Sequence, residues 1–88
     1  MTHHITVRHD TNKAKLTQHM ALTLKEDGHF TVSAANGEPS NRMEWAIASL
    51  DGFFPGYVVS HSSIEHAQGK GGGTVTLITK RVWIQKGE

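Results

Sequence analysis

The sequence predicts a two-layer α+β domain, in which an antiparallel sheet of about five strands packs one face against a single helix in the order βββαββ. Three observations carry this prediction. Apolar residues alternate in the N-terminal third, a helical stripe follows in the middle, and β-branched residues flank a glycine run in the C-terminal third. The 88 residues predict a single small domain spanning 1–88, with one modest core.

The N-terminal third is expected to form three strands. Ile5 and Val7 flank a threonine, and a second apolar set occupies even-numbered positions, namely Leu16, Met20, Leu22 and Leu24. A two-residue turn at Thr11–Asn12 would place Val7 opposite Leu16 and keep both apolar sets on one face. The third strand contains Phe30, Val32 and Ala34. A three-residue turn ending at Gly28 would precede it, because glycine adopts the left-handed conformation that such a turn needs.

The middle of the chain predicts one helix. Asn41 is expected to cap its first turn, and Glu44 three residues later completes a capping box. The apolar stripe has spacings of three and four and consists of Met43, Ala46, Ile47, Leu50 and Phe54. The helix should end near Asp51–Gly52. A helix of about 12 residues is roughly 18 Å long, so it leaves the other face of the sheet to solvent or to a partner.

Residues 69–74 read GKGGGT and connect the last two predicted strands, which begin at Tyr57 and Thr74. A phosphate-binding P-loop places its lysine after the glycines and leads into a helix. Here Lys70 precedes three glycines, and a β-type run follows. The glycine run is therefore interpreted as the loop of a long hairpin. The apolar residues of these two strands do not alternate cleanly, so either a bulge switches faces or both faces are partly buried.

Composition narrows the classes of function. Nine Lys and Arg residues against eight Asp and Glu give a formal net charge of +1, so any nucleic-acid binding must rest on a local patch. The chain has no cysteine, which excludes a disulfide framework and a Cys-ligated metal. The first ten residues lack the apolar segment of a signal peptide, and no apolar run approaches the roughly 20 residues of a membrane span. A cytoplasmic protein without membrane attachment is expected.

The first functional hypothesis is a small non-enzymatic binding module that docks on a protein or nucleoprotein, such as an inhibitor or accessory factor of a phage or mobile element. Trp45 lies about 180° from the centre of the apolar stripe on a helical wheel, so it should face away from the core. Trp45, Arg42 and Ala48 form the expected contact surface, because tryptophan is enriched in binding hot spots. The competing interpretation folds Trp45 back onto the 35–39 loop. A homodimer through the uncovered sheet face is a further expectation.

The second hypothesis is direct nucleic-acid binding through the glycine-rich hairpin and the basic last strand. Its candidate residues are Lys70, Lys80, Arg81 and Trp83, since a base can stack on an aromatic ring while cations meet phosphate. The competing interpretation places Trp83 in the core and uses the charges to protect a sheet edge from aggregation.

The third hypothesis is a weak metal or small-ligand site between His4 and His19, which the predicted first hairpin makes cross-strand neighbours. Two imidazoles are fewer ligands than a zinc site uses, so neither a metal nor another cofactor is expected. Catalysis has little support, because Ser60 and His61 are adjacent on a strand and therefore point to opposite faces. No nucleophile elbow is present either, and no catalytic residues are expected.

Overall fold

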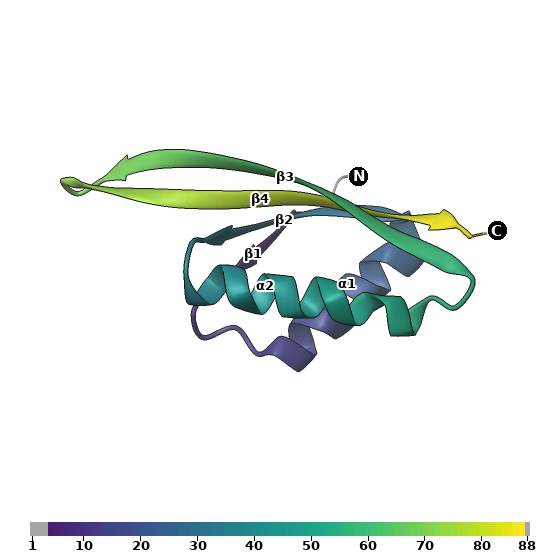
Figure 1. Ribbon diagram of the computed structural model, residues 1–88. Helices are drawn as coiled ribbons and strands as arrows, with labels where there is room; N and C mark the ends of the chain where they lie inside the picture. The colour runs from purple at the N-terminus through teal and green to yellow at the C-terminus, as the bar shows by residue number, and fades with distance from the viewer. Residues whose placement is uncertain (1–3, 88) are drawn as a thin grey trace.

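The computed structural model describes residues 4–87, apart from the side chains of Gln68 and Lys70. Its elements are β1 (His4–Val7), α1 (Lys13–Asp27), β2 (His29–Ala35), α2 (Glu38–Ser49), the short 3₁₀ helix η1 (Leu50–Phe53), β3 (Tyr57–Lys70) and β4 (Gly73–Lys86). The domain is α+β, as predicted, but it has two α-helices and four strands where one helix and about five strands are expected (Figure 1). No helix of the described chain is long and apolar enough to cross a membrane.

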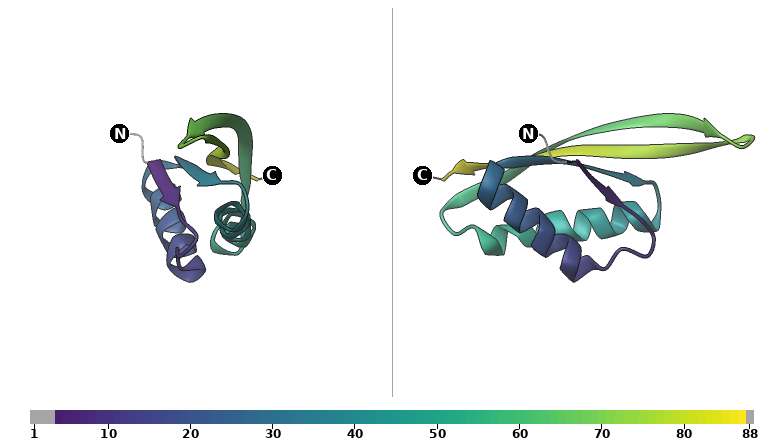
Figure 2. Two further views of the ribbon diagram at one scale, coloured as in Figure 1. Left: turned by 90° about the vertical axis from the view of Figure 1, so that its left-hand side faces the viewer. Right: turned by 180° about the vertical axis from the view of Figure 1, so that it is seen from behind.

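The four strands form one mixed sheet in the order β1-β2-β4-β3. β1 runs parallel to β2, whereas the pairs β2–β4 and β3–β4 are antiparallel. The predicted all-antiparallel sheet is wrong at β1, because α1 is a helical crossover that returns the chain to the start of a parallel neighbour. Both helices cover the same face of the sheet, and no described element covers the other face (Figure 2).

Residues 13–27 form helix α1 where the sequence predicts a strand. The two interpretations coincide at Leu16, Met20 and Leu24, because a spacing of four fits one face of a strand and one face of a helix. All three side chains are buried. Leu22 distinguishes the two, since a strand would bury it with the others and it is 58% exposed.

The ends of α1 also explain why the predicted turns are absent. Asn12 caps the helix by accepting a hydrogen bond at Oδ1 from the Lys15 N–H at 3.0 Å, so Thr11–Asn12 leads into a helix and not into a hairpin. Gly28 has a φ of 81°, the left-handed conformation expected of it. It serves as the C-cap of α1, however, where its N–H donates to the Leu24 carbonyl at 2.9 Å.

Helix α2 begins at Glu38, one turn before the predicted cap. Gly37 precedes the helix with a φ of 105°, and Pro39 lies in the first turn, where its missing N–H costs no helical hydrogen bond. Asn41 therefore lies inside the helix, which corrects the predicted capping box. The predicted stripe is confirmed, because the fold buries Met43, Ala46, Ile47 and Leu50 and packs Phe54 against the core.

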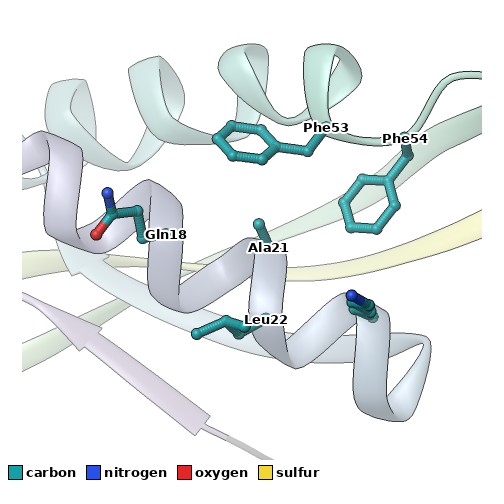
Figure 3. Close-up of a pocket in the computed structure, with 6 residues that line it drawn as sticks. Gln18, Ala21, Leu22, Phe53 and Phe54 are labelled. Carbon is teal, nitrogen blue, oxygen red and sulfur yellow. The ribbon is translucent and has the colours of Figure 1, made fainter.

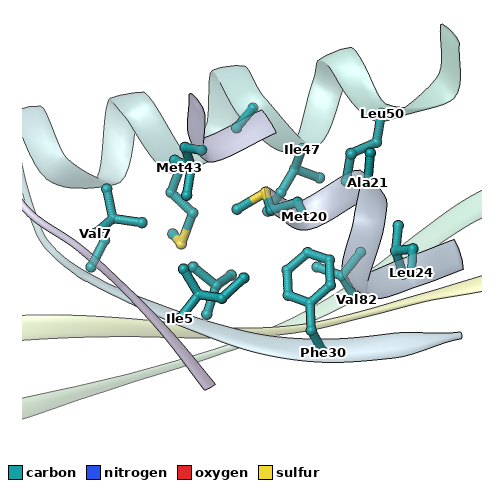
Figure 4. Close-up of a cluster of buried hydrophobic side chains, with 14 residues drawn as sticks. Ile5, Val7, Met20, Ala21, Leu24, Phe30, Met43, Ile47, Leu50 and Val82 are labelled. Carbon is teal, nitrogen blue, oxygen red and sulfur yellow. The ribbon is translucent and has the colours of Figure 1, made fainter. Parts of the chain in front are cut away.

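One hydrophobic core lies between the two helices and the covered face of the sheet (Figure 4). Its largest fully buried side chains are Phe30, Met20, Leu24, Met43, Leu50, Val32 and Val82. Full burial of one such side chain contributes roughly 1.5–3 kcal/mol to folding. The core therefore fixes the helices to the sheet and leaves the hairpin to extend from it.

β3 and β4 form a long hairpin whose register runs without a bulge from Tyr57 to the turn at Gly71–Gly72. Both turn glycines have positive φ, as a two-residue hairpin turn requires, so the interpretation of the glycine run is confirmed. β2 ends at Ala35, beside Leu77. Beyond this point the hairpin continues as a two-stranded ribbon, and the molecule measures 48 × 22 × 22 Å (Figure 1).

The continuous register also explains why β3 and β4 carry apolar residues at adjacent positions. Val82 is buried toward the helices, whereas its neighbour Trp83 lies half-buried on the opposite face. Val58 and Ile64 share that opposite face and are exposed. Both faces are thus partly apolar, and no bulge switches them. We call the side away from the helices the open face.

Candidate functional site

The end of the molecule from which the hairpin projects brings together residues from several elements. The C-terminal ends of β1 and β2 both lie at this end of the molecule, and the ribbon of β3 and β4 projects from it beyond Ala35. The connection from β1 to α1 and the start of α2 therefore lie at this end (Figure 1). We call this region the hairpin end; it comprises residues 8–15, 37–45 and 67–76.

Trp45 is exposed at the hairpin end, with 47% of its surface accessible. The Nζ of Lys13 lies 5.1 Å from the centroid of the ring, which is the geometry of a cation–π contact. Trp45 thus packs toward the start of α1. A cavity of about 380 Å³ beside it is lined by Lys13, Glu38, Asn41, Arg42 and Trp45. Ala48, further along α2, is exposed as well.

Arg42 holds the connection between β1 and α1 against α2. Its Nη1 donates to the Thr11 carbonyl at 2.9 Å, and its Nη2 donates to Glu38 Oε1 at 2.9 Å. Its buried Nε has no hydrogen-bond partner among the described residues. Most of the guanidinium is therefore committed to internal contacts, and Arg42 positions Lys13 and its surroundings more than it offers a free charge.

Three further cations, Arg8, Lys13 and Lys15, are exposed at the hairpin end, and none forms an ion pair within residues 4–87. The first turn of α1 contains no acidic residue. Because the N-terminus of a helix carries a partial positive charge, acidic residues are favourable there and lysines add to the positive potential. This arrangement favours an anionic partner. The sequence analysis missed these cations because it assigned their segment to a hairpin; the absence of acids after Asn12 was the available signal.

Arg81 and Trp83 lie on the open face, at the opposite end of β2 from the hairpin end, because Trp83 pairs with His29. Arg81 is exposed and Trp83 is half-buried. A cavity of about 460 Å³ is lined by Asp27, Gly28, His29, Arg81 and Trp83. These two candidates therefore share a surface with each other but not with Trp45.

The other two predicted nucleic-acid contacts are placed differently. Lys80 is only 5% exposed and points toward the helices, where its Nζ lies 2.9 Å from Glu44 Oε1 and donates to Ser63 Oγ at 2.8 Å. Because its ammonium group is buried and bonded to Glu44 and Ser63, Lys80 is not placed to contact a phosphate. The backbone of Lys70 lies at the tip of the ribbon, while its side chain falls outside the described part of the structure.

An apolar groove lies between α1 and η1 (Figure 3). It has a volume of about 410 Å³ and is lined by Gln18, Ala21, Leu22, Lys25, Phe53 and Phe54. Phe53 and Leu22 are 51% and 58% exposed. The sequence analysis missed the groove because it placed Leu22 on the buried face of a strand.

The structure separates the histidines and the serine that the sequence analysis considered. His4 lies on the open face of β1, whereas His19 lies on the exposed side of α1, so the predicted cross-strand pair does not exist. Within residues 4–87, no three His, Cys, Asp or Glu side chains are grouped as metal ligands. Ser60 and His61 occupy opposite faces of β3, since they pair with Trp83 and Val82.

Comparison of the chain with protein-family models finds no matching family, and comparison with curated proteins finds no match either.

Proposed function

We propose that this protein is a non-enzymatic binding module that docks on a nucleoprotein and contacts its nucleic acid at the hairpin end. The observation that carries the proposal is the contact of the exposed Trp45 with Lys13. Lys13 and the exposed Arg8 and Lys15 all lie within residues 8–15, and none of the three has an ion pair among the described residues. Cations meet phosphates through charge, and an aromatic ring offers a stacking surface to an unpaired base. Lys13 supplies such a cation and Trp45 supplies such a ring, and the two side chains contact each other.

The projecting ribbon supports the same partner. A two-stranded β-ribbon fits the major groove of a DNA duplex, and it can also follow a nucleic-acid backbone. The turn at Gly71–Gly72 has no side chains beyond hydrogen, so the tip can approach a phosphate backbone closely.

The small net charge sets the expected strength of binding. With a formal charge of only +1, affinity rests on the local patch of Arg8, Lys13 and Lys15. Contacts with about three phosphates give a slope of roughly −2 to −3 for the logarithm of the binding constant against the logarithm of salt concentration. Binding should therefore be weak at physiological salt and clear at low salt.

Fluorescence anisotropy with labelled single- and double-stranded DNA and RNA oligonucleotides at low salt tests the proposal. We expect saturable binding at micromolar protein, weakening as salt rises. Flat titrations with every oligonucleotide would rule out direct contact with nucleic acid.

A matched pair of variants locates the contact. Lys15→Glu reverses a charge at the start of α1, where an acid also stabilises the helix, so the fold is retained. Lys25→Glu makes the same change in the last turn of α1, which is away from the hairpin end. We expect Lys15→Glu to weaken binding about tenfold and Lys25→Glu to change it less than about twofold. Equal effects of the two variants would contradict the assigned site.

A second candidate is a protein partner that meets the same side of α2 through Trp45 and Ala48. The exposure of Trp45 favours it, because a tryptophan flanked by a small residue can enter a pocket on a protein surface. Affinity capture with and without nuclease distinguishes the two candidates. A partner that survives nuclease treatment and is lost with Trp45→Ala supports the protein contact, whereas a partner lost with nuclease supports the nucleic-acid contact.

A further inference from the structure

β3 presents a long free edge. It is the outermost strand of the sheet and pairs over its 14 residues with β4 only. Edge strands are usually protected by proline, by a bulge or by several charges. The sequence of β3 has no proline, its pairing with β4 has no bulge, and Glu65 is the only Asp, Glu, Lys or Arg between residues 57 and 69.

The hydrogen-bonding pattern of the hairpin identifies the free backbone groups on this edge. The Gly87 N–H donates to the Gly56 carbonyl at 2.8 Å, so residues 56 and 87 form a hydrogen-bonded pair next to the hairpin. Such pairs alternate with non-bonded pairs along an antiparallel ladder. Even-numbered residues of β3 therefore direct their N–H and C=O groups toward β4. Odd-numbered residues from 59 to 69 direct theirs to the free edge, whereas the Tyr57 N–H donates to the Phe54 carbonyl at 3.1 Å.

We propose that β3 pairs antiparallel with β3 of a second copy, about a two-fold axis at Ser63. This pairing joins two four-stranded sheets into one continuous sheet of eight strands. The outward groups of one copy then meet the outward groups of the other. Ser63 lies opposite Ser63 of the second copy, and His61 lies opposite Glu65 of the second copy.

Charge complementarity selects this register. Among registers that join outward-directed groups, only this one places the imidazole of His61 opposite the carboxylate of Glu65, and the symmetry repeats the contact. Moving the axis to residue 65 would oppose Glu65 to itself, which is unfavourable. Moving it to residue 61 would oppose the two His61 side chains.

The same register supports the projecting ribbon. A two-stranded hairpin alone is only marginally stable in water. In the proposed dimer, residues 67 and 69 of the ribbon lie beside residues 59 and 57 of the second copy and gain a third strand. The dimer uses the sheet edge and does not require the open face that the sequence analysis expected, and it is independent of nucleic-acid binding.

Sedimentation velocity of the oligonucleotide-free protein, from micromolar to millimolar concentration, tests the proposal. We expect a monomer–dimer equilibrium. His61→Glu should weaken the dimer about tenfold, because it opposes two carboxylates at two symmetric positions. Glu65→Lys should weaken it as well, because it removes the carboxylate that accepts from the His61 imidazole at both positions. The double variant His61→Glu/Glu65→Lys should recover most of the wild-type affinity, since it exchanges the two partners.

Two further variants separate edge pairing from association through the open face. Ala67→Pro removes an outward N–H and leaves the pairing with β4 intact, because proline is tolerated where the N–H faces away from the neighbouring strand. We expect it to abolish the dimer, while Val75→Lys on the open face should leave the dimer unchanged. A protein that stays monomeric at every concentration would overturn the proposal. So would a dimer that tolerates Ala67→Pro and is lost with Val75→Lys, or a charge exchange that restores nothing.

Discussion

At the scale of single residues, Lys80 shows how an ionic group can be held inside a small core. Its neighbours along the covered face of β4 are apolar, and its ammonium group reaches Glu44 on α2 and Ser63 on β3. The contact links a helix to the edge strand. A buried cation that loses its counter-charge keeps the full cost of desolvation, so the two partners should not be equally sensitive to substitution.

Glu44→Gln should therefore lower the free energy of unfolding by about 1–3 kcal/mol, because it leaves the buried Lys80 without a carboxylate. Lys80→Met should fall within about 1 kcal/mol of the wild type or above it, since it removes the charge itself. Urea denaturation measures both variants. Glu38→Gln, which breaks the exposed pair with Arg42, is the matched control and should cost less than about 1 kcal/mol. A loss with Lys80→Met as large as that with Glu44→Gln would contradict this account.

At the scale of elements, α1 shows where sequence patterns become ambiguous. Apolar residues at every fourth position satisfy a strand and a helix equally, whereas the exposure of Leu22 and the burial of Ala21 fit only the helix. In contrast, α2 has spacings of three and four that no strand reproduces, and the last two strands are bounded by a glycine run that only a hairpin accommodates. Most core residues of α1, β2 and α2 were therefore predictable, with Leu22 as an exception, but the connectivity of the N-terminal third was not.

Leucine substitutions in α1 test the assignment. Leu24→Ala should lower the free energy of unfolding by about 2–5 kcal/mol, because it leaves a cavity beneath a fully buried side chain. Leu22→Ala should change it by less than about 1 kcal/mol, since the side chain is mostly in water. Chemical denaturation of both variants decides the matter, and similar losses at the two positions would favour the strand.

The candidate site was only partly predictable from the sequence, because one of its two helices, α1, was predicted as a strand. The exposure of Trp45 follows from the stripe of α2 alone, and the sequence places it correctly. Its neighbour Lys13 comes from a helix that the sequence did not identify, so their contact could not be foreseen. Lys80 is a different case, because the sequence predicts it as an exposed nucleic-acid contact, whereas the structure buries it and pairs it with Glu44.

At the scale of the whole molecule, the shape and the distribution of charge both favour the hairpin end as the binding surface. The covered half of the sheet provides stability, and the ribbon extends from it beyond the start of α2 (Figures 1 and 2). Arg8, Lys13 and Lys15 at this end form no ion pair within residues 4–87, while Arg42 and Lys80 are used internally. We therefore propose that the protein binds its partner at the hairpin end and not at the open face around Arg81 and Trp83.

Amide chemical-shift mapping of the ¹⁵N-labelled protein with a short oligonucleotide at low salt tests this claim most directly. We expect the largest shifts within residues 8–15, 37–45 and 67–76. Shifts concentrated around Arg81 and Trp83, or around Leu22 and Phe53 in the groove, would contradict it, as would a spectrum that does not change.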